Sequence, residues 1–273
     1  MIFLDGVHVP ASSLKLGKKP HRNDNRNLLL PNYLVAGHLP MVPTSWFEWR
    51  KRVKNPWGMH LNNTLGTCMI AGPANAEELF SACRPGSSGQ IVVSDAQVLK
   101  EYESQGYIPG KPETDLGCDP LDVMKRWKSL GLFGLPPIEA FVSSSPGNLA
   151  HLRAGQYLLG VACMGFQMPI TAQRQLDRGE PWDVVKTNTG DADKGSWGGH
   201  EVLGEGYQFG RGVDERYDCI TWNQVQAMTP AFVEQYCDSC YFVLSPNWVH
   251  PDEQAANLFK HAELANDVQL LAS

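Results

Sequence analysis

Residues 62–68 read Asn-Asn-Thr-Leu-Gly-Thr-Cys, and a helical pattern begins at Cys68. A thiol at a helix start faces unpaired N–H groups and the positive end of the helix dipole, and both stabilise the thiolate. Gly66 lets the backbone approach whatever group the sulfur attacks. Cys68 is therefore a candidate nucleophile. The alternative is a buried core cysteine, because free cysteines are commonly buried.

A second stretch, residues 197–202, reads Trp-Gly-Gly-His-Glu-Val and opens a predicted strand. The two glycines before His200 leave its imidazole room to approach another element, although a lone histidine is more often structural than catalytic. Side chains alternate along a strand, so Glu201 and Glu205 should share the face opposite His200. We expect that face to be solvated or covered by a partner.

The rest of the chain predicts helices first and a strand-rich part later, which indicates an α+β fold. Pro73 falls near the start of the predicted helix after Gly66 and predicts a kink there. Thr171–Trp197 is predicted to be a long polar loop. Two other predicted helices begin at Ser94 or Asp95 and at Asp119, where these side chains can cap them. Three further helices are predicted over 146–158, 225–236 and 253–271. The predicted strands are 91–93, 138–143, 160–168, 199–209, 216–222 and 241–244.

Composition excludes several classes of protein. The 273 residues carry a net charge of −6, whereas non-specific nucleic-acid binding needs a basic face. No run approaches the 18 apolar residues of a membrane-spanning helix. Met1–Pro10 lacks the basic flank and apolar stretch of a signal peptide. We expect no nucleic-acid partner, no membrane partner and synthesis in a reducing cytoplasm, where the 7 cysteines stay thiols.

The remaining cysteine and glycine patterns predict no cofactor and no metal. The segment Cys237-Asp238-Ser239-Cys240 has no second cysteine pair with zinc spacing, and it follows a predicted helix instead of opening one, so structural thiols are the favoured interpretation. The glycines of 204–210 lie in a predicted strand and form no dinucleotide fingerprint.

The order of these pieces resembles papain-like cysteine peptidases: a cysteine at a helix start, a histidine about 130 residues later at a strand start, and then a tryptophan at a strand end. The chain is most similar to papain-like proteins of bacterial and phage genomes that carry an Asn-Asp-x-x-Gly-Asp-Cys motif. The matching pieces are Leu16–Pro20, Asn62–Cys68, Trp197–Val202, Thr221-Trp222 and Met228–Trp248.

This resemblance implies a papain-like α+β fold with a cleft between a helical part and an antiparallel strand-rich part. It makes Cys68 the nucleophile and His200 the general base and later acid. Asn62 lies six residues before the cysteine, where the family places an amide donor of the oxyanion hole.

The sequence also departs from the family pattern. Asn63 and Thr67 replace its two aspartates, and the asparagine that orients the histidine falls on Ile220, whose side chain accepts no hydrogen bond. Thr221 or Asn223 is a neighbouring substitute. Without an orienting group, the tautomer of the imidazole is less controlled.

We therefore predict an extended N-terminal arm over 1–57 and a papain-like domain over 58–273, acting as a cysteine peptidase or amide hydrolase on a peptide or protein substrate. The alternative is a weak or inactive structural protein, for example a phage virion component that docks on virion proteins or on itself through the arm. A third interpretation is a module that binds peptide without cutting it. The predicted location is the bacterial cytoplasm or a phage virion.

Overall fold

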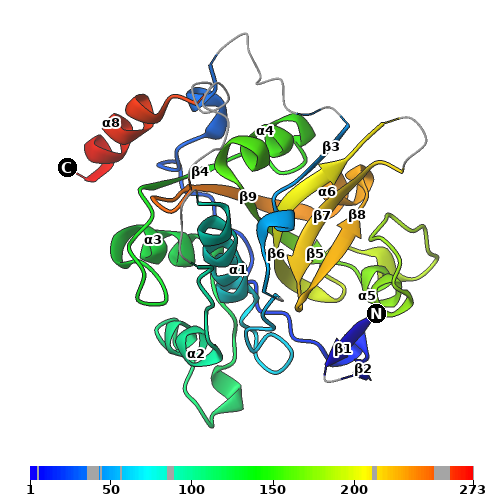
Figure 1. The fold of residues 1–273 in the computed structure, drawn as a ribbon. Coiled ribbons are helices and arrows are strands. Elements are labelled where there is room, and N and C mark those ends of the chain that lie inside the picture. The colour runs from blue at the N-terminus through cyan, green and yellow to red at the C-terminus, as the bar shows by residue number, and fades with distance from the viewer. Residues whose placement is uncertain are drawn as a thin grey trace.

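The protein is described by a computed structural model of a chain that folds around one antiparallel sheet (Figure 1). The structure describes residues 1–4, 6–35, 43, 45–55, 57–84, 89–210, 214–248 and 259–272. The strands are β1 (Ile2–Leu4), β2 (Val7–Val9), β3 (Trp46–Glu48), β4 (Ala140–Ser143), β5 (Ala162–Met168), β6 (Gly198–Gln208), β7 (Arg216–Thr221), β8 (Gln224–Met228) and β9 (Cys237–Leu244). The α-helices are α1 (Cys68–Cys83), α2 (Asp95–Glu103), α3 (Pro120–Leu130), α4 (Leu149–Leu159), α5 (Ile170–Arg178), α6 (Pro230–Tyr236) and α8 (His261–Ala272).

The main sheet has the strand order β4-β9-β5-β6-β7-β8, and β3 pairs with β6 outside that path. Every pairing in it is antiparallel. Helix α1 packs against β6 and β7, with α2 and α3 beyond it on the side away from the sheet (Figure 1). The start of α1 and the start of β6 therefore come from the two parts of an α+β architecture, as predicted.

Local capping signals placed two helices correctly. Ser94 caps α2 in a reciprocal arrangement with Gln97, and the Asp119 carboxylate accepts the N–H groups of Leu121 and Asp122 at the start of α3. Gly131 ends α3 at φ 74°, a conformation that favours glycine.

Helix α1 continues through Pro73 from its first residue to Cys83. Pro73 removes one N–H donor from the helix, but nearly every residue of α1 is buried. Tertiary packing of this kind stabilises a helix more than intrinsic propensity does, so α1 accommodates the proline without ending. The kink itself stays a prediction.

The predicted strand 91–93 is wrong. The backbone N–H of Ile91 donates to the Ser81 hydroxyl and that of Val93 donates to the Glu78 carboxylate, both at 2.9 Å. Two side chains of α1 thus take the place of a neighbouring strand, and the segment stays irregular.

Two further predictions failed in part. The predicted loop Thr171–Trp197 begins with helix α5, whose buried face combines Ala172 and Leu176 with the polar Thr171 and Gln175 and so gave a weak apolar pattern. The predicted helix 225–236 begins as strand β8 paired with β7. Helix α6 starts only at Pro230, with Thr229 as its cap.

The N-terminal 57 residues contain more regular structure than an extended arm. β1 and β2 form a hairpin, and β3 joins the main sheet beside β6. Residues 253–258 of the predicted C-terminal helix lie outside the described residues. The division at residue 57 stays a prediction.

Candidate active site

Cys68 is the first residue of α1 and is 1% exposed. Thr67 precedes it at the cap position, but the Thr67 hydroxyl donates to the His60 carbonyl at 2.8 Å and does not cap the helix. The backbone N–H groups of Glu201 and Gly17 face the Cys68 sulfur as donors. The thiol therefore lies against the backbone of the residue that follows His200 in β6.

His200 is fully buried on β6, and its two ring nitrogens differ in environment. Nε2 lies 2.7 Å from Thr221 Oγ1, whereas no described group bonds Nδ1. The Trp222 ring stacks on the imidazole with centroids 4.0 Å apart and planes 9° apart, so it covers one face of the ring. Thr221, one residue past the expected position, is the residue whose side chain contacts His200 Nε2.

The strand register explains why Thr221 and not Ile220 meets the imidazole. In the β6–β7 pairing, Leu203 faces Ile220. Leu203 lies on the opposite face of β6 from His200 because successive side chains alternate, and Ile220 shares that opposite face. Thr221 is the next residue and therefore lies on the face of His200.

Asn62 is also buried, and its side-chain amide already binds carbonyl oxygens. Its Nδ2 donates to the carbonyls of Lys15 and Leu65, at 3.2 Å each. One of these acceptors belongs to its own loop and the other to the N-terminal segment. The amide thus faces the segment that covers the site, and a carbonyl of that segment occupies it.

Residues 15–19, which we call the strap, run between the start of α1 and the start of β6. The Lys18 N–H donates to the Gly199 carbonyl at 3.0 Å, and the Gly17 carbonyl accepts the Cys118 N–H at 2.7 Å. A Cβ on Gly17 would lie 1.9 Å from the Gly66 carbonyl oxygen, and one on Gly199 would lie 2.1 Å from the Lys18 carbonyl oxygen. Only glycine fits at both contacts, so the strap seals the site closely.

Burial under the strap keeps both reactive groups neutral. It raises the pKa of the Cys68 thiol to about 12, against the smaller lowering effect of the Glu201 and Gly17 N–H groups. Burial, helped by the charge of the Lys18 ammonium, lowers the pKa of His200 to about 3. The covered site therefore holds a thiol and a neutral imidazole, with no ion pair between them.

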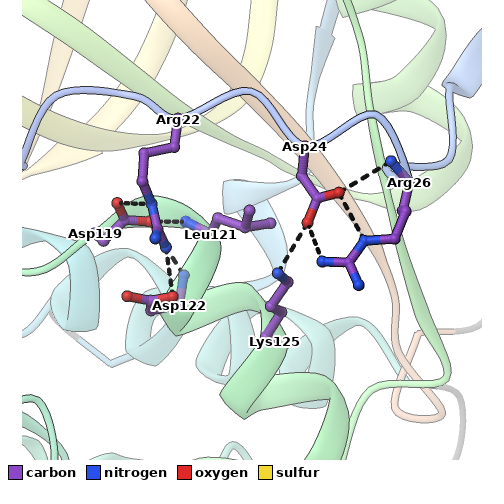
Figure 2. A network of polar contacts seen from close by, with 7 residues as sticks. All are labelled: Arg22, Asp24, Arg26, Asp119, Leu121, Asp122 and Lys125. Carbon is purple, nitrogen blue, oxygen red and sulfur yellow. Dashed lines mark hydrogen bonds and ion pairs between the residues drawn. The ribbon is translucent and has the colours of Figure 1, made fainter.

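Exposed ion pairs hold the chain that follows the strap along α3 (Figure 2). The Arg22 guanidinium contacts Asp119 and Asp122 at 2.6 Å each, and Asp24 contacts Lys125 at 3.0 Å. Surface pairs of this kind contribute little each, about 0–1 kcal/mol, so they guide the segment more than they fix it.

The expectation that Glu201 and Glu205 lie on a solvated or partner-covered face is wrong. Both are buried, because α1 and the short helix Arg50–Arg52 cover that face of β6. Glu201 lies against Gly72 of α1, where a Cβ would come within 2.4 Å of its carboxyl oxygen. Burial raises the pKa of Glu201 well above its ordinary value.

The carboxylate of Glu205 pairs with Arg50 at 2.5 Å, and Asp218 pairs with the same guanidinium at 3.0 Å. Glu48 completes this buried group of three carboxylates around one arginine. Burial raises the pKa of Glu205 to about 7 despite the Arg50 charge. These contacts join β6 and β7 to the segment just before the site.

All seven cysteines are buried free thiols. Cys237 and Cys240 lie at the start of β9, directly after α6, and not at a helix start. Among the residues that the structure describes, no group of three His, Cys, Asp or Glu side chains is arranged to hold a metal ion. Within the same ranges, no helix is long and apolar enough to span a bilayer.

The fold is similar to solved structures of cysteine proteases. Xylellain, a cysteine protease from Xylella fastidiosa, matches with a TM-score of 0.63 at 15% identity over 85% of this chain and 97% of its own. Procathepsin B S9 from Trypanosoma congolense matches with a TM-score of 0.56 at 13% identity over 86% and 88%. Digestive procathepsin L 3 from the larval midgut of Tenebrio molitor matches with a TM-score of 0.54 at 10% identity over 86% and 76%.

No protein-family model matches the chain, and no curated protein matches it. At these identities the likeness is one of fold. It confirms the predicted α+β architecture.

Proposed function

From the papain-like fold that the chain adopts, we propose that the protein is a cysteine peptidase or amide hydrolase with Cys68 as nucleophile and His200 as general base. The observation that carries the proposal is the state of the imidazole. Thr221 engages Nε2, while Nδ1 is left without a partner in a strand whose backbone touches the Cys68 sulfur. Membership of the phage and bacterial group stays a prediction from short motifs.

The proposed reaction begins when Nδ1 takes the proton of the Cys68 thiol. Nε2–H then donates to the Thr221 hydroxyl oxygen, and this tautomer leaves the Nδ1 lone pair free. The sulfur adds to a peptide or amide carbonyl, the C–N bond breaks, and the amine leaves with the proton from Nδ1. Water then hydrolyses the thioester with His200 again as base, which releases the acid and restores the thiol.

Asn62 is the proposed donor to the developing oxyanion. Its Nδ2 already binds the Lys15 carbonyl of the strap, so it can bind a substrate oxygen once the strap has left. Charge develops on that oxygen in the transition state, where such a donor contributes typically about 10²–10³ in rate.

Because the strap covers Cys68 and His200, this structure corresponds to a resting state of the proposed enzyme. Neutral Cys68 and neutral His200 follow from burial, and no substrate reaches a sulfur that is 1% exposed. Displacing the strap hydrates both groups, and it lets the imidazolium and the dipole of α1 stabilise the thiolate.

Thiol labelling tests the proposed nucleophile. The variant Lys18→Glu places a carboxylate where the strap lysine now meets Asp238, and this repulsion should free the strap. We expect iodoacetamide at pH 6 to alkylate Cys68 in this variant at least about tenfold faster than the other six cysteines, as thiolate character predicts. Peptide mapping by mass spectrometry measures the rates. Added protease first checks that the strap of this variant is accessible, because only a freed strap can be cut. If the strap is cut and all seven cysteines are still labelled equally slowly, the proposal is contradicted.

The role of Thr221 is tested by Thr221→Val and Thr221→Ser in the Lys18→Glu background. Valine keeps the shape and removes the hydroxyl, so hydrolysis of a fluorogenic peptide should fall by about 10–10³, since the imidazole loses its orienting partner. Serine keeps the hydroxyl and should retain most of the activity. The pH profile of Cys68 alkylation should also change in Thr221→Val, because the orientation of the ring affects how it takes the thiol proton. A variant that is only less stable would keep the original profile. Full activity in Thr221→Val would remove Thr221 from the mechanism.

A further inference from the structure

The strap carries a lysine whose side chain is as buried as a core residue. The Lys18 side chain is 1% exposed, and its Nζ lies 2.8 Å from Asp238 Oδ2 and 3.3 Å from the Lys19 carbonyl oxygen. An ammonium taken out of water needs such partners, because an unpaired buried charge costs several kcal/mol. The site around it is therefore built for a cation.

The walls of this site form a channel that fits a long aliphatic stem. Gly165 of β5 lines it, and a Cβ there would lie 2.2 Å from both Lys18 Cε and the Ser239 hydroxyl. At the far end, Gln167 and Ser239 donate to the two carboxyl oxygens of Asp238, at 3.4 Å each. We call this the Lys18 channel, lined by Gly165, Asp238 and Ser239. Only a residue without a side chain at position 165 leaves it open.

The channel lies next to the proposed catalytic pair. The Lys18 N–H donates to the carbonyl of Gly199, and Gly199 is the residue before His200. Glu201 follows His200 and faces Gly165 in the strand pairing, and its buried carboxyl group lies beside the Cys163 thiol. A cation in the channel thus pairs with the Asp238 carboxylate, and Glu201 lies on the neighbouring strand.

We propose that the Lys18 channel is a substrate subsite and that the enzyme selects peptides with a lysine or arginine side chain next to the scissile bond. The inference rests on the proposed function. Backbone hydrogen bonding at Gly199 would hold the peptide main chain, and Asp238 would receive the basic end of the side chain. Lys18 then occupies the subsite of its own chain until a substrate replaces it.

Binding tests the channel without any need for turnover. The protein is the full chain with Lys18→Glu and Cys68→Ala, and the probe is a fluorescein-labelled peptide of residues 13–22, Ser-Leu-Lys-Leu-Gly-Lys-Lys-Pro-His-Arg. The comparison peptide has norleucine at position 18, which keeps the stem and removes the charge. Anisotropy titration should show at least about tenfold tighter binding of the lysine peptide, since the channel ends in a buried carboxylate.

Two variants control the binding test. Asp238→Asn keeps the shape and one acceptor oxygen but removes the charge, so it should abolish most of the preference for lysine. Lys19→Glu in place of Lys18→Glu makes the same charge change on the neighbouring residue and should leave the strap in place, so that neither peptide binds. Equal binding of the two peptides to the Lys18→Glu chain, or binding of neither, would overturn the subsite.

Hydrolysis separates this inference from the proposed function. Fluorogenic peptides that differ only by lysine or norleucine are offered to the Lys18→Glu chain with Cys68 intact. Preferential cleavage of the lysine peptide supports both proposals. Cleavage without preference overturns the subsite and leaves the peptidase standing. Selective binding without any cleavage keeps the subsite and overturns the peptidase.

Discussion

The Lys18→Glu chain loses peptide hydrolysis when Cys68 is replaced by alanine, with an expected fall of at least about 10⁴-fold. The loss is this large because the nucleophile and its base act as a unit, so that removing one member removes most of the benefit of the other. A continuous assay with a fluorogenic peptide measures it. The residual rate reports what the remaining site contributes by binding alone.

Cys163 provides the matched control for this change. It is as buried as Cys68, and burial raises its pKa well above the ordinary value, but it lies within β5 and not at a helix start. Cys163→Ala should therefore change stability slightly and leave the rate of hydrolysis within about twofold, as expected for a thiol outside the chemistry. If Cys163→Ala reduced the rate as much as Cys68→Ala, the nucleophile would be assigned to the wrong residue.

Replacing Arg50 with methionine should lower the free energy of unfolding by about 3–5 kcal/mol, the usual cost of leaving buried charge without its partner. Arg50 contacts Glu48, Glu205 and Asp218, and each of these three carboxylates is at most 5% exposed. Without the guanidinium, the carboxylates repel one another in a dry environment. Urea denaturation followed by tryptophan fluorescence measures the change.

Lys51→Met is the control for Arg50→Met. Lys51 pairs with Glu48 but is 60% exposed, so its loss should cost only about 0–1 kcal/mol. The double variant Arg50→Met with Glu205→Gln should recover part of the stability, because it removes one of the stranded charges. Equal destabilisation by Arg50→Met and Lys51→Met would show that the buried group does not depend on its arginine.

The candidate site could be predicted from sequence where the evidence is local. Cys68 follows Gly66 and Thr67 at a helix start, and His200 follows two glycines at a strand start, so both patterns are visible within a few residues. Capping rules placed α2 and α3 for the same reason, since the caps contact backbone groups two or three residues away. The roles of Cys68, His200 and Asn62 themselves stay proposals that the experiments above address.

The partner of His200 could not be identified in this way. Spacing alone pointed to Ile220, because the family places its asparagine two residues before the tryptophan. The residue that meets Nε2 depends on which positions of β6 and β7 face each other, and that register exists only once the strands have paired. Thr221 was visible in the sequence as a substitute, but nothing in the sequence ranked it first.

The sequence by itself determined the α+β class and the starts of α2 and α3. It also placed Cys68 at the start of a helix and His200 near the start of a strand. The tertiary structure alone decided that Glu201 and Glu205 are buried, that Thr221 contacts the imidazole, and that the Lys18 side chain is buried against Asp238. Periodicity and capping arise from neighbours along the chain, whereas burial and pairing of charges depend on elements far apart in sequence. Lys18 and Asp238 are separated by 220 residues, so no local pattern contains their contact.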